Sequence, residues 1–335
     1  MIDLSGKRII ISRTDSIGDV VLTLPICNWI KSNFKDVTLI FLGSGYTKPI
    51  VDCSQDVDEF IDWDTFKDIP KANKKIKFRA IDADVIIHVF PNKEIAALAK
   101  TLRVPVRVGT SHRMYHLLTC SHRIDFTRKR SDKHESQLNF ELLRPFGIKT
   151  IPPLEEVKSM LRSFKVPKVD FPNEVQSYIN GDKYVILHPK SQGSAKEWPI
   201  GNYIELANSL NEKGLKVIFT GTQAEGDLFR DELPKNDLLF DSTGKLTLQE
   251  LITTIGGSNG LVACSTGPLH IAGILDRKAI GIFSPRKPIH PGRWQPLGND
   301  SKALVFDKEC PKCKKGEDCG CLEDISVKMV LSELL

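Results

Sequence analysis

The chain has 335 residues, of which 41% are hydrophobic and 27% are charged, a composition that fits a globular protein long enough for two domains. It contains no apolar run near the ~20 residues that a membrane-spanning helix needs. Charged residues near the start also interrupt the apolar core that a signal peptide requires, so we expect a cytoplasmic protein.

The positive charge of the chain is unevenly distributed. The formal net charge is +5, yet the stretch from Lys93 to Lys149 alone has 12 Lys or Arg residues against 5 Asp or Glu. Such a local excess indicates an anionic partner, although a solvated basic face without a partner has the same composition. Few aromatic residues are interleaved with these basic ones, so nucleic acid is not an expected partner.

Short β-branched runs alternate along the chain with segments of helical periodicity. Strands are predicted in the first half at residues 8–12, 37–41, 84–89 and 107–109, and in the second half at residues 184–188, 216–220, 261–264 and 279–283. Helices are predicted between them, notably over residues 19–32, 200–213, 247–255 and 268–275. Near-continuous apolar strands that alternate with helices predict parallel βαβ units, and therefore the α/β fold class.

Prolines interrupt regular structure near the middle of the chain, at Pro167 and Pro172. Each side of this seam holds about enough chain for one doubly wound sheet, so we predict domains at residues 1–165 and 166–335. In such sheets ligands bind beyond the carboxyl ends of the strands. The loops that follow the predicted strands are therefore the first places to look for functional residues.

The first of these loops, residues 13–19, leads into a predicted helix. Gly18 allows a tight turn, and Asp19 lies near the start of the helix, in one of the loops where an α/β enzyme keeps its functional residues. Spacing alone favours a simpler explanation, in which Asp19 caps the helix and complements the helix dipole.

The loop at residues 188–199 is small, polar and cationic. Ser191, Gly193 and Lys196 offer a hydroxyl, backbone N–H groups and an ammonium to a diphosphate. The Gly-Lys-Ser/Thr spacing of a Walker A motif is absent, and an ordinary exposed loop explains the composition equally well.

The segment Ser265-Thr266-Gly267-Pro268 follows another predicted strand and begins a helix. The free N–H groups at that helix start form an anion site, which Gly267 leaves open to close approach and to which Thr266 adds a hydroxyl. His270, in the first turn, could donate to the same anion. A lone histidine in a helix is more often structural, but this one shares its loop with three other groups suited to an anion.

Acidic residues elsewhere are weaker candidates. Glu225, after the strand at residues 216–220, could accept hydrogen bonds from ribose hydroxyls or could simply cap a helix. The Asp-x-Asp triplets at residues 56–58 and 82–84 have the composition of a divalent-metal site, but no strand pattern places them at one. We interpret both triplets as surface or strand-edge carboxylates.

Four of the eight cysteines lie close together near the end of the sequence, at Cys310, Cys313, Cys319 and Cys321. A structural zinc ion, reduced thiols and a local disulfide are all compatible with this cluster, whose last pair is closer than in an ordinary two-knuckle zinc site. No catalytic role is expected for it, and no metal ligand is assigned to the active site. The remaining four are expected to be buried thiols: Cys27, Cys53, Cys120 and Cys264.

Taken in order, these loops resemble those of the heptosyltransferases of glycosyltransferase family 9. The resemblance covers nearly the whole chain and is strongest after Tyr184. The matching segments are residues 13–25, 188–199, 217–225, 244–251, 265–272, 281–285 and 310–325. The family pattern includes the Lys-x-Trp-Pro ending of the second of these segments.

The resemblance implies a GT-B architecture, in which two Rossmann-like doubly wound parallel-sheet domains face a cleft. Residues 1–165 would bind the acceptor and residues 166–335 the nucleotide sugar, and the final helix could pack back on the first domain. The implied reaction is inverting transfer of a heptose from ADP-heptose to a lipopolysaccharide inner-core acceptor, with no metal or other cofactor required.

Mapped by motif, the resemblance assigns Asp19 as the general base that deprotonates the acceptor hydroxyl. Since a carboxylate near a helix start is held in its charged form, domain closure and desolvation must raise its basicity. The acceptor-binding residues would be Arg13, Gly18 and Thr23. The residues for the donor and its diphosphate would be Ser191, Gly193, Lys196, Glu225, Ser265, Thr266, Gly267 and His270.

Ser265 departs from the family pattern, in which many members have Asp at this position. That Asp is expected to contact the donor sugar or its phosphates, so another heptose or a hexose donor stays open. The basic stretch would meet an anionic lipid-linked glycan at the inner-membrane surface, with the chain attached peripherally as a monomer.

Alternatives to this function stay open. A GT-B transferase that acts on capsule or O-antigen glycan is one, and a non-catalytic nucleotide- or glycan-binding relative is another. An NAD-dependent oxidoreductase is disfavoured, because no Gly-x-Gly-x-x-Gly follows a predicted strand.

Overall fold

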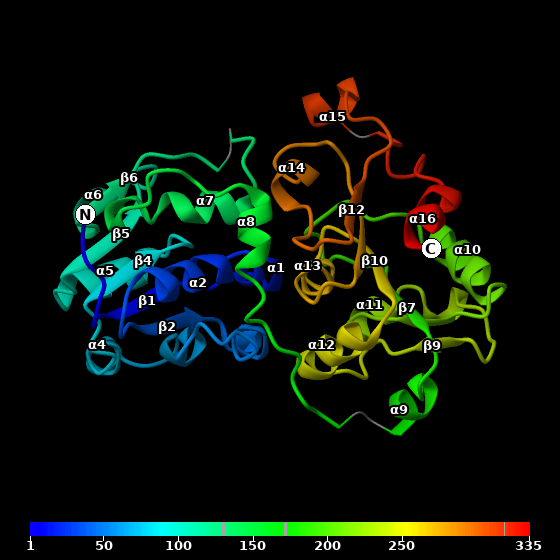
Figure 1. Ribbon diagram of the computed structural model, residues 1–335, viewed down its shortest axis with the longest axis horizontal. Helices are drawn as coiled ribbons and strands as arrows, with labels where there is room; N and C mark the ends of the chain where they lie inside the picture. The colour runs from blue at the N-terminus through cyan, green and yellow to red at the C-terminus, as the bar shows by residue number, and fades with distance from the viewer. Residues whose placement is uncertain (129–130, 171–172, 318) are drawn as a thin grey trace. The chain divides into compact units, whose positions relative to one another are not determined.

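The computed structural model describes residues 1–128, 131–170, 173–317 and 319–335. It divides into two compact units, Met1–Lys165 and Val166–Leu335. Each unit contains one six-stranded sheet in which every neighbouring pair of strands is parallel (Figure 1). The predicted α/β fold class is therefore confirmed.

The first unit has the strand order β3-β2-β1-β4-β5-β6. The elements, in chain order, are β1 Arg8–Ser12, α1 Ile17–Val21, α2 Leu24–Asn33, β2 Thr38–Gly43, η1 Gly45–Thr47, α3 Lys48–Val51, β3 Glu59–Asp62, η2 Trp63–Phe66, α4 Lys71–Arg79, β4 Val85–His88, α5 Lys93–Thr101, β5 Val106–Thr110, α6 His116–Thr119, β6 His122–Ile124, α7 Glu135–Glu141, η3 Arg144–Phe146 and α8 Leu154–Ser159. The predicted helix at residues 19–32 is divided into α1 and α2, because Pro25 begins a new helix where its ring would break a continuous one.

The second unit has the order β12-β11-β10-β7-β8-β9, which repeats the topology of the first. The elements are α9 Asn173–Ile179, β7 Tyr184–His188, α10 Ile200–Asn211, β8 Lys216–Phe219, α11 Gln223–Gly226, η4 Arg230–Glu232, β9 Leu239–Asp241, α12 Leu248–Gly257, β10 Gly260–Cys264, α13 Gly267–Ile274, β11 Lys278–Ile282, α14 Pro291–Trp294, β12 Ser301–Leu304, α15 Pro311–Lys315 and α16 Val327–Leu334. Both sheets thus reverse their strand order at one point, between β1 and β4 in the first unit and between β7 and β10 in the second.

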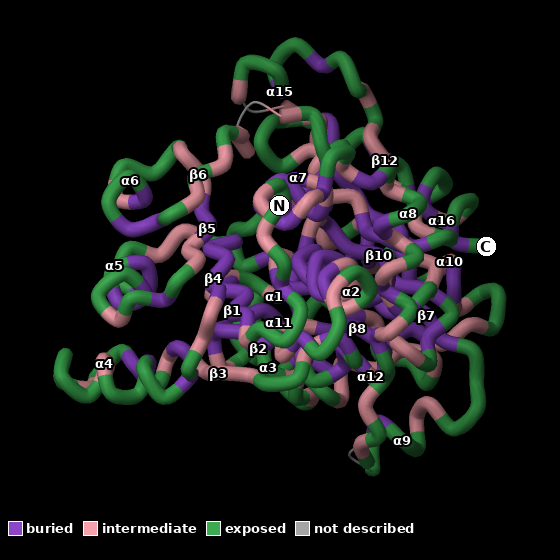
Figure 2. Tube along the Cα trace, turned by 60° about the vertical axis from the view of Figure 1, so that its left-hand side comes forward, coloured by how far each residue is buried: buried purple, intermediate pink, exposed green. Residues whose placement is uncertain are grey.

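Burial follows the apolar runs of the sequence. The central strands of both sheets are almost wholly buried, α5 alternates between buried and exposed residues, and α4 is mostly exposed with Phe78 buried (Figure 2). Four strands escaped prediction from the sequence, and they are the four edge strands β3, β6, β9 and β12. Each has three or four residues and is only partly buried, so its sequence lacks the apolar run that marks a central strand.

The final helix, α16, belongs to the core of the second unit. Its apolar residues Val327, Val330 and Leu334 are buried in the same cluster as strands β7, β8, β10 and β11, and α16 packs against α10 (Figure 1). Its amphipathic face therefore covers one side of the second sheet. The predicted contact of this helix with the first domain stays a prediction.

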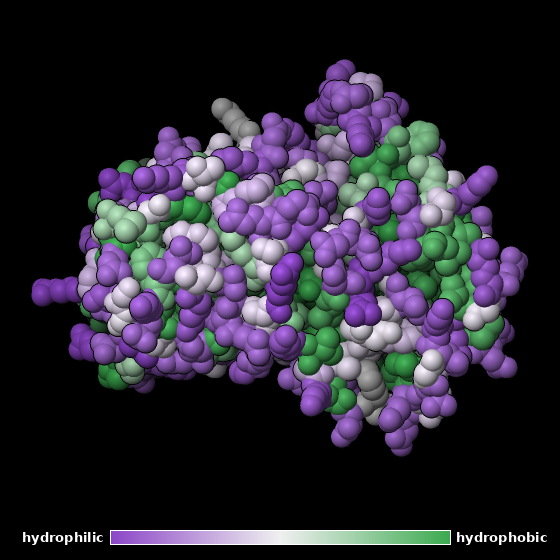
Figure 3. Space-filling model, in the orientation of Figure 1, coloured by the Kyte–Doolittle hydropathy of each residue, from purple (hydrophilic) through white to green (hydrophobic). Residues whose placement is uncertain are grey.

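Hydrophilic side chains predominate on the face shown in Figure 3, with apolar residues in smaller groups between them. Among the described residues, no helix has the length and apolar composition needed to cross a bilayer.

Candidate active site

Three of the four loops singled out in the sequence lie where the strand order reverses. Residues 13–16 follow β1, residues 189–199 follow β7, and Ser265 and Thr266 follow β10. Because the crevice at a reversal is open above the sheet, this is where doubly wound folds bind ligands. The two sheets therefore each present one candidate binding edge.

Arg13 is the centre of an ion-pair network in the first unit. Its side chain is 3% exposed, and its guanidinium pairs with Asp19, with Asp15 at 2.7 Å and with Glu135 at 3.4 Å. Glu135, the first residue of α7, is itself 1% exposed and pairs with Arg128. A buried cation shared by three carboxylates holds the loop after β1 in place. Arg13 is therefore placed to orient the carboxylates, and its predicted contact with the acceptor stays a prediction.

Asp19 lies in the first turn of α1 but does not cap it. Ser16 is the N-cap residue, and its hydroxyl donates to Asp19 Oδ2 at 2.5 Å instead of binding the helix backbone. The Asp19 side chain is 18% exposed and is held by Ser16 and Arg13. The simple capping explanation is thus not what the geometry shows, and a fixed, partly accessible carboxylate remains.

Gly18 and Thr23 support Asp19 from within α1 and the turn that follows it. Gly18 is buried, and the Thr23 hydroxyl donates to the Asp19 carbonyl at 2.8 Å and accepts from Asn139 at 3.3 Å. Thr23 is fully buried, so its hydroxyl is used inside the protein. This hydroxyl supports the backbone of Asp19, and the contact of Thr23 with the acceptor stays a prediction.

Asp15 is a second carboxylate on the same loop, and sequence reasoning did not select it as a site residue. Burial raises the pKa of Asp15, and the nearby Arg13 guanidinium opposes that rise. Its side chain is 22% exposed. The first unit therefore offers two neighbouring carboxylates that share one arginine.

In the second unit, the loop after β7 is shaped by Glu197. Glu197 accepts hydrogen bonds from the Ser191 backbone N–H at 2.8 Å and from the Ser191 hydroxyl at 3.0 Å, and it pairs with Lys190 at 3.0 Å. Ser191 is thus bound internally, as part of the frame of the loop. Gly193 has a φ of 78°, the left-handed conformation that glycine adopts without steric cost, and no atom lies where a Cβ would be.

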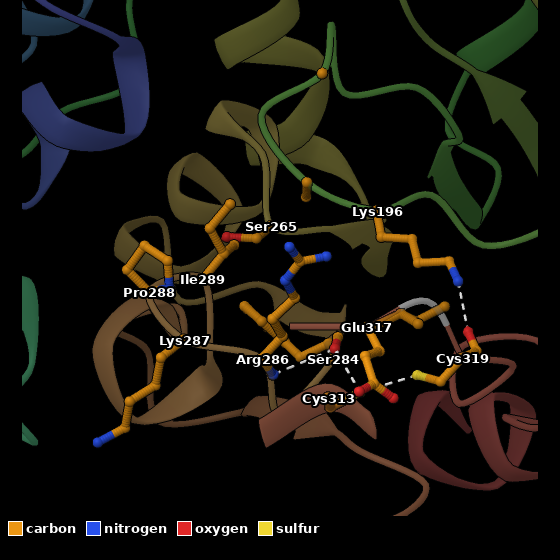
Figure 4. A pocket seen from close by; sticks show the side chains of 14 residues that line it. Lys196, Ser265, Ser284, Arg286, Lys287, Pro288, Ile289, Cys313, Glu317 and Cys319 are labelled. Atoms are coloured by element: carbon orange, nitrogen blue, oxygen red, sulfur yellow. Dashed lines mark hydrogen bonds between the residues drawn. The ribbon is translucent and has the colours of Figure 1, made fainter. Parts of the chain in front are cut away.

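Lys196 and Ser265 line one pocket of about 350 Å³, together with Gly193 and Arg286. Lys196 extends across the pocket and donates to the Cys319 carbonyl at 2.5 Å, and the Arg286 guanidinium lies between Ser265 and Lys196 in Figure 4. Three cationic residues, Lys196, Arg286 and Lys287, thus line a cavity large enough for part of a nucleotide. This is the electrostatic arrangement expected of a diphosphate site.

The helix start at Thr266 adds backbone donors near this pocket. Thr266 is the N-cap of α13 and makes no side-chain capping bond, and Gly267 and Pro268 form the first turn. The Thr266 side-chain oxygen is buried and, among the described residues, has no hydrogen-bond partner. His270 is 3% exposed and packs edge-on against Trp294, with ring centroids 6.3 Å apart. The first turn of α13 therefore has N–H groups that no helical carbonyl satisfies.

Glu225 forms a capping box at the start of α11. Its Oε2 accepts from the Thr222 backbone N–H at 2.7 Å and from the Thr222 hydroxyl at 3.0 Å, while Thr222 in turn accepts from the Glu225 N–H. Glu225 therefore caps α11, which is the structural explanation that the sequence allowed for this residue. The same arrangement recurs at Thr247 and Glu250, which begin α12.

Residues that the sequence did not select hold both sites together. Glu135, Arg128 and Asn139 support the loop after β1, and Arg286 and Glu317 line the pocket. Arg286 could have been found, since it follows the predicted strand at residues 279–283. Glu135 could not, because its partner Arg13 is 122 positions away in the sequence.

In each Asp-x-Asp triplet one carboxylate lies at a strand edge, as predicted, whereas Asp56 is buried and accepts from Asn28 at 3.2 Å. Asp58 accepts from the backbone N–H of Leu39 at 2.6 Å, and Asp84 accepts from that of Arg8 at 3.0 Å. Both carboxylates therefore fasten the ends of strands.

Comparison with known proteins identifies the family. The model of glycosyltransferase family 9 (heptosyltransferase) matches residues 74–321, which is well over half of the chain. The chain belongs to glycosyltransferase family 9. Lipooligosaccharide heptosyltransferase 2 of Campylobacter jejuni is 23% identical over 95% of this chain and 94% of the relative.

Solved structures show the same fold. ADP-heptose LPS heptosyltransferase II of Escherichia coli has a TM-score of 0.75 and 18% identity, covering 98% of this chain and 97% of that one. The Escherichia coli heptosyltransferase WaaC, solved with ADP, has a TM-score of 0.73 and 17% identity, covering 98% of this chain and all of that one. The predicted GT-B fold and the predicted transferase class of this family 9 protein are thus confirmed.

Proposed function

We propose that this family 9 glycosyltransferase moves a heptose from ADP-heptose to a lipopolysaccharide inner-core acceptor, with inversion at the anomeric carbon. The observation that carries the proposal is the cationic pocket of the second unit, where Lys196 and Arg286 lie beside Ser265 at the reversal of the strand order. The names of the relatives supply the sugar and the nucleotide, since they include ADP-heptose and lipopolysaccharide heptosyltransferases.

On the donor side, the second unit binds the diphosphate. Lys196 and Arg286 neutralise its charge, and the N–H groups at the start of α13 donate to its oxygens. Negative charge grows on the phosphate oxygen when the bond to the anomeric carbon breaks. The same cations therefore stabilise the departing ADP more strongly than the intact donor, and this difference lowers the barrier.

On the acceptor side, Asp19 takes the proton of the attacking hydroxyl. The hydroxyl oxygen then forms the new bond to the anomeric carbon as the bond to the diphosphate breaks. Arg13 and Ser16 fix the orientation of the Asp19 carboxylate, so it can meet the acceptor hydroxyl in one geometry.

Ser265 bears on which sugar the donor carries. Ser265 lines the pocket, and its carbonyl accepts from Ser194 at 3.4 Å. A serine leaves more room and less negative charge than the aspartate common in the family. We therefore propose that Ser265 alters the choice of sugar, and that Ser265→Asp shifts donor preference while ADP affinity changes less than threefold.

The acceptor is lipid-linked, and the first unit has a surface suited to an anionic membrane. Met114, Leu117 and Leu118, around α6, are 86%, 57% and 73% exposed. Arg113 and Arg123 lie in the same segment of the basic stretch. Apolar side chains flanked by cations favour the interface of an anionic bilayer. We propose that the protein works as a monomer in the cytoplasm, attached peripherally to the inner membrane.

Calorimetric titration with ADP, UDP and GDP tests the nucleotide. We expect ADP to bind at least tenfold more tightly than the others, and Lys196→Ala to weaken it by roughly 10–100-fold, the value of one charge-assisted hydrogen bond. Lys245→Ala is the matched control, because Lys245 pairs with Glu174 away from the pocket. A preference for UDP or GDP would instead support a capsule or O-antigen transferase. No binding at all would support the non-catalytic alternative.

A further inference from the structure

The four clustered cysteines near the end of the chain come together in the structure. The sulfur atoms of Cys310, Cys313, Cys319 and Cys321 all lie within 4.8 Å of one another. Three of these residues are buried and Cys319 is half-buried. None of the four forms a disulfide in the described structure.

We propose that these four cysteines form a tetrahedral thiolate site for one zinc or iron ion, and that this ion fixes the position of Lys196 and Arg286 in the donor pocket. Four thiolates are the ligand set that both ions accept in tetrahedral geometry. Each thiol releases its proton when the ion binds. The part of the proposal that concerns the donor pocket rests on the proposed function, whereas the metal site itself does not.

The geometry favours a metal over disulfides. In a tetrahedral zinc site with bonds of about 2.3 Å, the sulfurs are about 3.8 Å apart, so all four are mutual neighbours. Two disulfides would instead bring the sulfurs together in pairs at about 2.05 Å, with no reason for the pairs to converge. The observed quartet lies within 4.8 Å throughout, with Cys313 Sγ and Cys319 Sγ 2.9 Å apart, so binding of an ion needs this pair to separate and the longer distances to shorten, each by about 1 Å.

The backbone around the four cysteines brings their sulfurs together despite the uneven spacing in the sequence. Cys310 is the N-cap of α15 and Cys313 is the third residue of the same short helix, so one turn of chain carries two of the four sulfurs. On the other side, the chain bends at Gly320, between Cys319 and Cys321, so both sulfurs reach the cluster. The short Cys-x-Cys spacing, which argued against a two-knuckle site in the sequence, is therefore compatible with one shared centre.

Charge also favours a thiolate site. Four thiolates around a divalent ion have a formal charge of −2, which is costly without compensation. The helix that carries Cys313 contains three lysines, Lys312, Lys314 and Lys315. These cations offset the negative charge of the site.

The cluster is joined directly to the donor pocket through two contacts. The carbonyl of Cys319 accepts the hydrogen bond from Lys196, and the sulfur of Cys313 lies 3.3 Å from the Ser284 hydroxyl, which accepts from the Arg286 backbone N–H at 3.2 Å. Cys313 and Cys319 are themselves part of the pocket wall (Figure 4). A metal that fixes these two cysteines therefore fixes both cations that face the diphosphate.

Metal content is the first test. Protein purified without chelator should contain about one zinc or iron ion per chain by elemental mass spectrometry, which also identifies the ion. Cobalt exchanged into the stripped protein should show the intense visible bands of tetrahedral thiolate coordination. Cys310→Ser and Cys321→Ser should lose the metal, whereas Cys53→Ser, at a buried thiol of the first unit, should retain it. A wild-type protein that holds no metal and takes up none after reduction would overturn the proposal, whether its thiols are free or joined in disulfides.

The second test concerns the pocket and uses the wild-type chain, so it does not depend on the folding of a variant. Removal of the ion should weaken ADP binding roughly 10–100-fold, and readdition should restore it. In Lys196→Ala, removal of the ion should weaken ADP binding by a clearly smaller factor. The reason is that the contact between the Cys319 carbonyl and Lys196 is already absent in this variant. Equal ADP affinity with and without metal would refute the link to the pocket. Failure of the loaded protein to bind ADP would refute the proposed function and leave the metal measurement standing.

Discussion

The ion-pair network around Arg13 makes Asp19→Asn the most informative single substitution in the first unit. Asparagine keeps the size of the side chain and can still accept from the Ser16 hydroxyl, but it has no charge and cannot take a proton. The guanidinium of Arg13 retains two other carboxylates, Asp15 at 2.7 Å and Glu135 at 3.4 Å. The fold should therefore tolerate the change.

The magnitudes follow from that geometry. Removal of a partly exposed partner from a cation that keeps two others should lower the free energy of unfolding by about 1 kcal/mol or less. Loss of a general base should lower kcat by about 10²–10⁴-fold. ADP affinity should stay within about twofold, because all the proposed nucleotide contacts lie in the second unit.

Two matched variants separate catalysis from structure. Asp15→Asn removes the neighbouring carboxylate and should lower kcat by less than tenfold. Glu135→Gln removes the buried carboxylate shared by Arg13 and Arg128, while Arg13 keeps Asp15 and Asp19, so it should cost about 1–3 kcal/mol of stability.

The assay is release of ADP from the sugar donor in the presence of acceptor, measured beside chemical denaturation and ADP calorimetry. If Asp19→Asn retains more than a tenth of wild-type kcat, or if Asp15→Asn is the variant that loses activity, Asp19 is not the base. A parallel loss of ADP binding in Asp19→Asn would also contradict the assignment.

Three further predictions concern the rest of the chain. Glu225→Ala should lower stability by about 0.5–2 kcal/mol through loss of its capping box, and should also weaken ADP binding if Glu225 contacts the ribose as proposed. Leu117→Ser combined with Leu118→Ser should weaken sedimentation with anionic vesicles at least threefold, without change in ADP affinity. His88, whose pKa is lowered to about 3 by burial, should make the first unit acid-sensitive, with stability falling by up to about 1.4 kcal/mol per pH unit below pH 6.5.

Each of these three predictions has a matched control. Glu250→Ala removes a matching capping box from α12 and should cost similar stability with no change in ADP affinity. Vesicles of neutral lipid should bind the wild type and the leucine variant equally weakly. For His88, the unfolded state takes up a proton between pH 6.5 and about 3 while the folded state stays neutral, so stability is present above pH 6.5 and lost as the pH falls. His88→Gln should flatten this slope, and an unchanged slope would show that other groups cause the acid sensitivity.

The sequence by itself determined the α/β class and the central strands of both sheets. Strands β1 and β7 begin and end at the predicted residues. Both are buried on both faces, and a strand buried in this way has the near-continuous apolar run by which it was predicted. The loops after β1, β7 and β10 were also predictable, since glycine, proline and hydroxyl residues mark a strand that turns into a helix. The four edge strands were not predictable, because partial burial leaves them without an apolar run.

Only the tertiary structure decided which groups act together. Glu135 meets Arg13 across 122 positions, and the Cys319 carbonyl meets Lys196 across 123. No local sequence pattern predicts such a pair. Helical and strand periodicity determine which residues a few positions apart are neighbours, whereas tertiary packing determines which distant residues meet. The sequence thus located the residues of the candidate site one loop at a time. The fold decided that Arg13 and Thr23 support Asp19, and that the clustered cysteines border the pocket that contains Lys196.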